Sequence, residues 1–69
     1  MKKAMILLAD GFEEIEAFAT VDILRRASIT CHMISLDSDM VRGCHDIQVM
    51  SDYSLKDIDT SEYDMIILP

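Results

Sequence analysis

The sequence is poor in basic residues and has no long apolar run. Six Lys and Arg stand against thirteen Asp and Glu, which gives a net charge of −7. Because no basic stripe is present, nucleic-acid binding is not expected. The apolar runs are too short to span a membrane, and Lys2-Lys3 is followed by a short apolar run and then by acids, unlike a signal peptide. We therefore expect a cytoplasmic protein that binds neither nucleic acid nor a membrane.

Glycine and cysteine are equally scarce, with two of each. Gly11 lacks the glycine spacing of a phosphate-binding loop, so no nucleotide cofactor is expected. Two cysteines without a secretory signal indicate free thiols in a reducing compartment. Cys31-His32 and Cys44-His45 offer metal-ligand chemistry, but neighbours in a strand point to opposite faces and no CxxC pair is present. We therefore expect no metal and no cofactor, with Cys31 buried in a strand and Cys44-His45 in a surface loop.

The sequence does contain the pattern of a parallel α/β sheet. Doubly apolar runs at 5–8 and 65–69 predict strands that are covered on both faces, and residues 29–36 predict another strand. Asp10-Gly11 predicts a sharp turn, after which helical spacing extends from about residue 12 to 27.

Between the second and last of these strands, the pattern predicts a small antiparallel excursion. Short strand candidates at 40–42 and 47–50 flank a turn, and residues 53–64 predict a polar crossover with one helical turn. This order predicts an α/β fold with a doubly wound, flavodoxin-like, mostly parallel sheet and a small hairpin insertion. One long helix in 69 residues covers little sheet, so we expect residues 1–69 to be the N-terminal portion of a single larger domain.

Three carboxylates, Glu13, Glu14 and Glu16, stand at the start of the predicted helix, where negative charge complements the helix dipole. One apolar arc of this helix comprises Phe12, Ile15, Ala19, Ile23 and Ala27. Glu16 projects into that arc, where lost solvation favours its protonated form, whereas the other two acids turn away. Ligand crevices of α/β folds lie at the carboxyl ends of strands, so Glu16 lies where a ligand would bind. The alternative is that Glu16 only complements the dipole.

Three stretches carry a resemblance to a known family: ILLADGFEEIEA at 6–17, VDILRRA at 21–27 and DMIILP at 64–69. Together they resemble the opening of the ThiJ/PfpI superfamily in its DJ-one-like branch, which has a class I glutamine amidotransferase-like fold. The resemblance implies that Glu16 is the family's buried, protonated acid beside a nucleophilic cysteine. It also implies that the nucleophile and its elbow lie beyond Pro69, because neither cysteine of this chain matches. This chain alone is therefore not expected to catalyse the reaction.

The same resemblance implies a homodimer to which the helix contributes, with His45 flanking the partner subunit's site. The implied function is that of a cofactor-free, cysteine-dependent glyoxalase or deglycase acting on a small carbonyl substrate. Three alternatives stay open: a redox-sensing stress protein or chaperone without turnover, a PfpI-type cysteine peptidase, and a protein of thiazole monophosphate (thiamine) biosynthesis.

Overall fold

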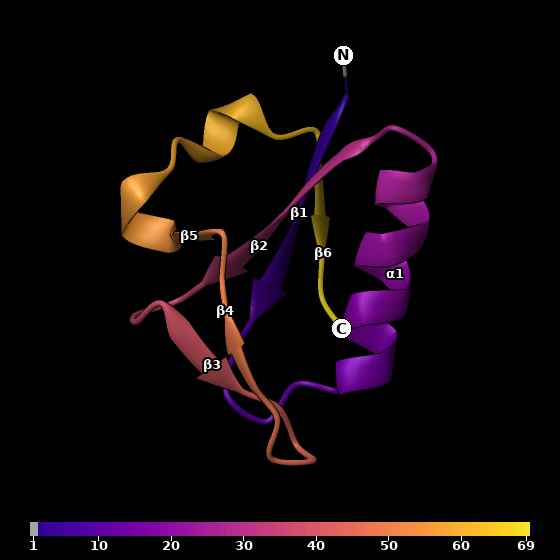
Figure 1. The fold of residues 1–69 in the computed structure, drawn as a ribbon. Coiled ribbons are helices and arrows are strands. Elements are labelled where there is room, and N and C mark those ends of the chain that lie inside the picture. Colours follow the sequence, from indigo (N-terminus) through magenta and orange to yellow (C-terminus); the bar gives the residue numbers. More distant parts are fainter. Residues whose placement is uncertain (1) are drawn as a thin grey trace.

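The computed structural model describes residues 2–69 as one parallel sheet flanked by a helix and a hairpin (Figure 1). The sheet has the strand order β5-β2-β1-β6, and its four strands all pair in parallel. They are β1 (Lys3–Leu8), β2 (Thr30–Ser35), β5 (Tyr53–Ser54) and β6 (Met65–Ile67). The doubly apolar strand β1 lies inside the sheet, between β2 and β6, as its composition predicts. The mostly parallel α/β sheet is therefore confirmed.

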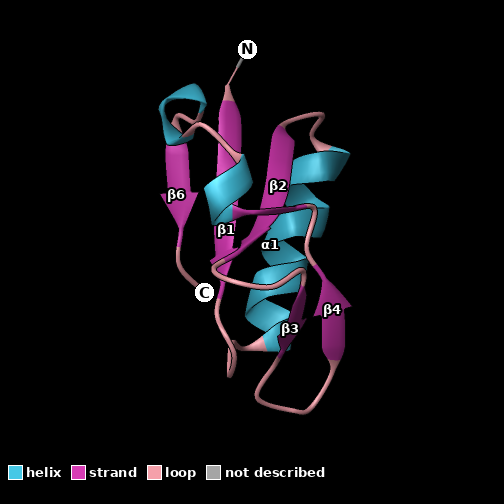
Figure 2. Ribbon diagram, turned by 90° about the vertical axis from the view of Figure 1, so that its left-hand side faces the viewer, coloured by secondary structure: helices cyan, strands magenta, loops and turns pink. Residues whose placement is uncertain are grey.

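Helix α1 (Glu14–Arg26) lies against one face of the sheet, and the crossover after β5 passes over the other (Figures 1 and 2). This crossover holds two short 3-10 turns, η1 (Leu55–Asp57) and η2 (Thr60–Glu62). The pattern predicted one helical turn here, but it missed the two residues of β5 that extend the sheet beside β2. Within residues 2–69, no helix has the length and apolarity needed to cross a membrane.

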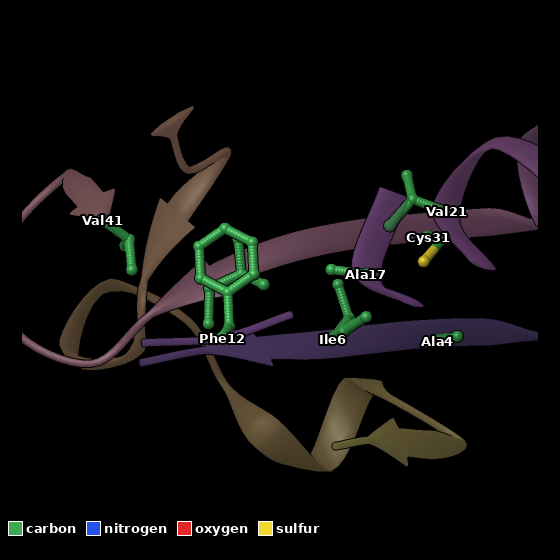
Figure 3. Close-up of a cluster of buried hydrophobic side chains, with 8 residues drawn as sticks. Ala4, Ile6, Phe12, Ala17, Val21, Cys31 and Val41 are labelled. Atoms are coloured by element: carbon green, nitrogen blue, oxygen red, sulfur yellow. The ribbon is translucent and has the colours of Figure 1, made fainter. Parts of the chain in front are cut away.

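The core lies between α1 and the sheet (Figure 3). It comprises Ala4, Ile6, Leu8, Phe12, Ala17, Val21, Cys31 and Val41. Of the apolar arc of the helix, Phe12 is buried, whereas Ile15 and Ile23 are 78% and 64% exposed. The helix instead buries Ala17 and Val21, whose small side chains let its backbone approach β1 closely. Both sides of the helix carry apolar residues, so spacing alone did not show which side faces the sheet.

A hairpin of β3 (Met40–Arg42) and β4 (Gln48–Met50) forms as predicted and is antiparallel. Its loop lies beside the segment that enters α1 (Figure 2). Gly11 has a φ of 93°, which permits the sharp turn there, and its N–H donates to the carbonyl of Arg42 at 2.8 Å. The N–H of Cys44 donates to the carbonyl of Phe12, also at 2.8 Å. These backbone bonds fix the hairpin loop to the start of the helix.

Candidate functional site at the helix start

Glu14, at the first position of α1, is buried beneath the loop of the β3–β4 hairpin. Its side chain is 5% exposed. One carboxylate oxygen, Oε2, accepts from the backbone N–H of His45 at 2.8 Å and from that of Ile47 at 3.4 Å. The other, Oε1, lies 2.8 Å from Nδ1 of His45 and 3.6 Å from Sγ of Cys44. A buried charge is tolerated only when it is paired and hydrogen-bonded, and this carboxylate is both.

Gly43 provides the space that the carboxylate occupies. A Cβ atom added at this glycine would lie 2.3 Å from Oε2 of Glu14 and 2.7 Å from its Cγ. Both separations are far below van der Waals contact, so no larger residue fits while Glu14 keeps its position. The hairpin loop and the helix start are thus matched in shape as well as in hydrogen bonds.

The electrostatics of the site favour a charged Glu14. Burial raises the pKa of Glu14, but hydrogen bonds from the His45 side chain and from the backbone N–H groups of Glu14, His45 and Ile47 outweigh it, and the pKa falls to about 2. The hydrogen bond to Glu14 and the nearby charge of Glu13 raise the pKa of His45 above its usual value of 6.5. The pair therefore holds a proton on the imidazole rather than on the carboxylate.

Neither cysteine has the features of a nucleophile. Cys31 is 2% exposed, as the sequence predicted, and burial raises the pKa of its thiol. Cys44 is exposed in the hairpin loop, as predicted, but partial burial and the carboxylates of Glu13 and Glu14 raise the pKa of its thiol as well. Reactive cysteines need a lowered pKa, so both thiols are mainly protonated at neutral pH.

Residues 2–69 by themselves do not bury Glu16. Glu16 is exposed, and the buried acid of this helix is Glu14. Glu14 is buried because it lies on the side of the helix that packs against the rest of the chain. With Ala17 and Val21 it follows the i, i+3, i+7 spacing of the buried stripe. That spacing was visible in the sequence, but no local signal showed that a hairpin loop would cover the acid. His45 lies in the loop as predicted, and the structure joins it to Glu14 rather than to Glu16.

A surface hollow lies at the carboxyl ends of the strands, where α/β folds bind ligands. It is lined by residues that follow β1, β2 and β6, namely Ala9, Asp10, Gly11, Phe12, Leu36, Leu68 and Pro69, together with Leu7. Of the described residues, neither Glu14 nor Glu16 lines this hollow. The structure therefore separates the strand-end hollow from the Glu14 cluster.

A parallel sheet with one helix packed on β1 and β2 and a hairpin inserted after β2 defines a flavodoxin-like α/β protein. Comparison with known families matches residues 2–69 to the DJ-1/PfpI family, and the chain belongs to that family. A solved DJ-1 superfamily protein of Salmonella typhimurium, a cysteine-to-alanine mutant, superposes with a TM-score of 0.94 at 41% identity. The match covers 100% of this chain and 38% of that one.

Two curated relatives extend this likeness. Protein dj-1beta of Drosophila melanogaster is 35% identical over 99% of this chain and 37% of its own length. A deglycase of Thermococcus kodakarensis is 28% identical over 97% of this chain and 40% of its own length. The chain thus spans about two fifths of the length of these relatives.

Proposed function

We propose that the whole protein is a cysteine-dependent enzyme of the deglycase or glyoxalase kind, acting on small reactive carbonyl compounds. The observation that carries this proposal is the membership of residues 2–69 in the DJ-1/PfpI family, together with the likeness to a relative that is named a deglycase. The raised thiol pKa of both cysteines in this chain supports a nucleophile located elsewhere in the whole protein.

In this proposal Glu16 is the acid that acts beside the nucleophile. It stands in the first turn of α1, which follows the carboxyl end of β1. Glu14 is already engaged by the hairpin loop, whereas the Glu16 carboxyl makes no hydrogen bond to the rest of residues 2–69. A thiolate adds to the aldehyde carbon of the substrate, and Glu16 transfers a proton to the carbonyl oxygen. The remainder of the protein would cover Glu16 and exclude water from its carboxyl.

Turnover of methylglyoxal by the full-length protein tests the enzymatic role. We expect Glu16→Gln to lower the rate by about 100-fold or more, because a general acid contributes about that factor. Glu62→Gln, which changes an exposed acid of η2, is the matched control and should keep the rate. Equal rates for the wild type and Glu16→Gln would remove Glu16 from the mechanism. If the wild type shows no turnover and one cysteine oxidises readily, the protein is a redox sensor instead of an enzyme.

We also propose that the outer face of α1 joins two subunits in a homodimer. Ile15 and Ile23 stand exposed on that face, and large exposed apolar side chains that gather on one face mark interaction sites. Ile23→Lys should therefore convert the dimer to a monomer in sedimentation velocity measurements. Glu62→Lys, which changes an exposed acid of η2 away from α1, is the control. A monomeric wild type would contradict this assignment.

A further inference from the structure

Four side chains that can bind a metal converge where the hairpin loop meets the start of α1. They are Glu13, Glu14, Cys44 and His45, and one donor atom from each lies within 4.8 Å of the others. Two come from the entry to the helix and two from the loop after β3. We propose that these residues form a binding site for a divalent transition metal, with Zn²⁺ as the favoured ion. This site is independent of the proposed carbonyl chemistry.

The separations between donor atoms suit tetrahedral coordination. Zinc bonds of about 2.0–2.3 Å place neighbouring donors about 3.3–3.7 Å apart. Sγ of Cys44 lies 3.3 Å from Nδ1 of His45, 3.5 Å from Oε2 of Glu13 and 3.6 Å from Oε1 of Glu14. Nδ1 of His45 lies 2.8 Å from Oε1 of Glu14 and 3.9 Å from Oε1 of Glu13, the other oxygen of that carboxylate. An ion at the centre requires one oxygen of Glu13 to turn toward it, and the donor atoms of Glu14, Cys44 and His45 to move by about half an ångström.

The donor types select the ion. Thiolate and imidazole are preferred by zinc and by neighbouring transition metals, whereas calcium and magnesium take oxygen donors in larger numbers. On binding, Zn²⁺ replaces the thiol proton of Cys44 and the proton that His45 shares with Glu14, and these protons pass to solvent. Two carboxylates, one thiolate and a neutral imidazole then surround the ion, which leaves a net charge of −1.

The backbone of the hairpin loop already orients the buried ligand. Oε2 of Glu14 is held by the N–H groups of His45 and Ile47, so Oε1 is turned toward the sulfur and the imidazole. Such supporting hydrogen bonds are what fix ligands in metal sites. Gly43 provides the space for this carboxylate. The His45 side chain is 68% exposed, which leaves the site open to an incoming ion.

From the sequence we considered only cysteine and histidine as ligands, and we excluded Cys31-His32 because neighbours in a strand point to opposite faces. Cys44 and His45 are in a loop, where both side chains turn toward the same point. The remaining two ligands are glutamates about thirty residues earlier in the chain. The four ligand residues are visible in the sequence, but their side chains converge only because the hairpin docks on the helix start.

Cys31 and His32 provide matched controls, because they form the same Cys-His dipeptide as Cys44 and His45 but lie in strand β2. Competition between the purified full-length protein and a chromophoric zinc chelator measures the affinity. We expect Cys44→Ala and His45→Ala to weaken binding of one Zn²⁺ per chain by at least about 100-fold, since loss of even a supporting residue costs up to that factor. Cys31→Ala and His32→Ala should change it by less than about threefold. Equal affinity in Cys44→Ala and wild type would overturn the site.

A second measurement begins with the wild-type protein alone. Added Co²⁺ should give the wild-type protein the thiolate-to-cobalt charge-transfer absorption and the intense visible bands of a tetrahedral site. Cys44→Ala should lose the charge-transfer band and Cys31→Ala should keep it. A wild type without this band, or a Cys44→Ala variant that retains it, would contradict the proposal, because Cys44 would then not be a ligand.

Discussion

The same dipeptide, Cys-His, occurs twice in this chain with opposite outcomes. In β2 the Cys31 side chain packs in the core beneath α1, while His32 points to the other face of the sheet. There Nδ1 of His32 lies 2.7 Å from the hydroxyl of Tyr63, and its ring packs edge-on against that tyrosine. In the hairpin loop, by contrast, Cys44 and His45 turn toward each other. A strand separates neighbouring side chains and a loop can bring them together, so backbone conformation decides what a pair of residues can do.

The two pairs also depend on different parts of the fold. Cys31 belongs to the core and stabilises it as an apolar side chain. Cys44 and His45 contribute little to the core, and their arrangement depends on Glu14 beneath them. Changes in the core should therefore disturb Cys31 and His32, and changes around Glu14 should disturb the arrangement of Cys44 and His45.

The largest effect is expected from Gly43→Ala, which removes the space for Glu14. Overpacking of this kind lowers the free energy of unfolding by about 3 kcal/mol, and it should also return the pKa of His45 toward its usual value. Urea unfolding and an NMR titration of the His45 ring measure the two effects. Gly11→Ala is the control, because a Cβ there meets open space and the only cost is its positive φ. A Gly43→Ala protein with wild-type stability would show that Glu14 moves freely.

A smaller effect is expected from exchanging each sulfur for oxygen. Cys31→Ser places a hydroxyl in an apolar core and should lower the free energy of unfolding by about 1–2 kcal/mol. Cys44→Ser, at an exposed position, should change it by less than about 0.5 kcal/mol in metal-free buffer. Chemical denaturation of both variants checks this difference. Equal losses would mean that the strand and loop positions are not as different as their burial indicates.

The stability contributed by the Glu14–His45 pair should fall at both high and low pH. Because the pKa of His45 is raised on folding, its contribution to stability is present below pH 6.5 and is lost as the pH rises through the folded pKa. Because the pKa of Glu14 is lowered, its contribution is present above its ordinary value of 4.5 and is lost as the pH falls toward 2. The ring protons of His45 should report the raised pKa, and Glu14→Gln should lower it. An unchanged His45 pKa in that variant would contradict the pairing.

The smallest effect is expected from Asp46→Asn in the same loop. This change removes an exposed ion pair with Arg42, which contributes about 0.5 kcal/mol or less. Asn accepts the positive φ of 68° at this position as readily as Asp does. Unfolding at low and high salt should give nearly the same free energy in variant and wild type. A loss as large as that of Gly43→Ala would place the stability of the loop in its surface charges instead of in Glu14.

Much of this fold was predictable because its signals are local. The unbroken apolar run of β1, the turn at Gly11 and the helical spacing that follows each depend on neighbouring residues. The bounds of β3 and the antiparallel hairpin were also predicted correctly. The two-residue strand β5 was missed, since so short a pairing leaves no periodic pattern. The family resemblance likewise depends on contiguous sequence, and the family comparison confirms it.

By itself, the sequence determined the strands, the helix, the hairpin and the family, since hydrophobic periodicity, turn residues and motifs are properties of adjacent positions. Only the tertiary structure decided which of three neighbouring glutamates is buried and which of two Cys-His pairs converges on a single point. Those outcomes depend on contacts between residues about thirty positions apart. Such contacts arise when the hairpin docks on the helix start, and no local pattern encodes that docking.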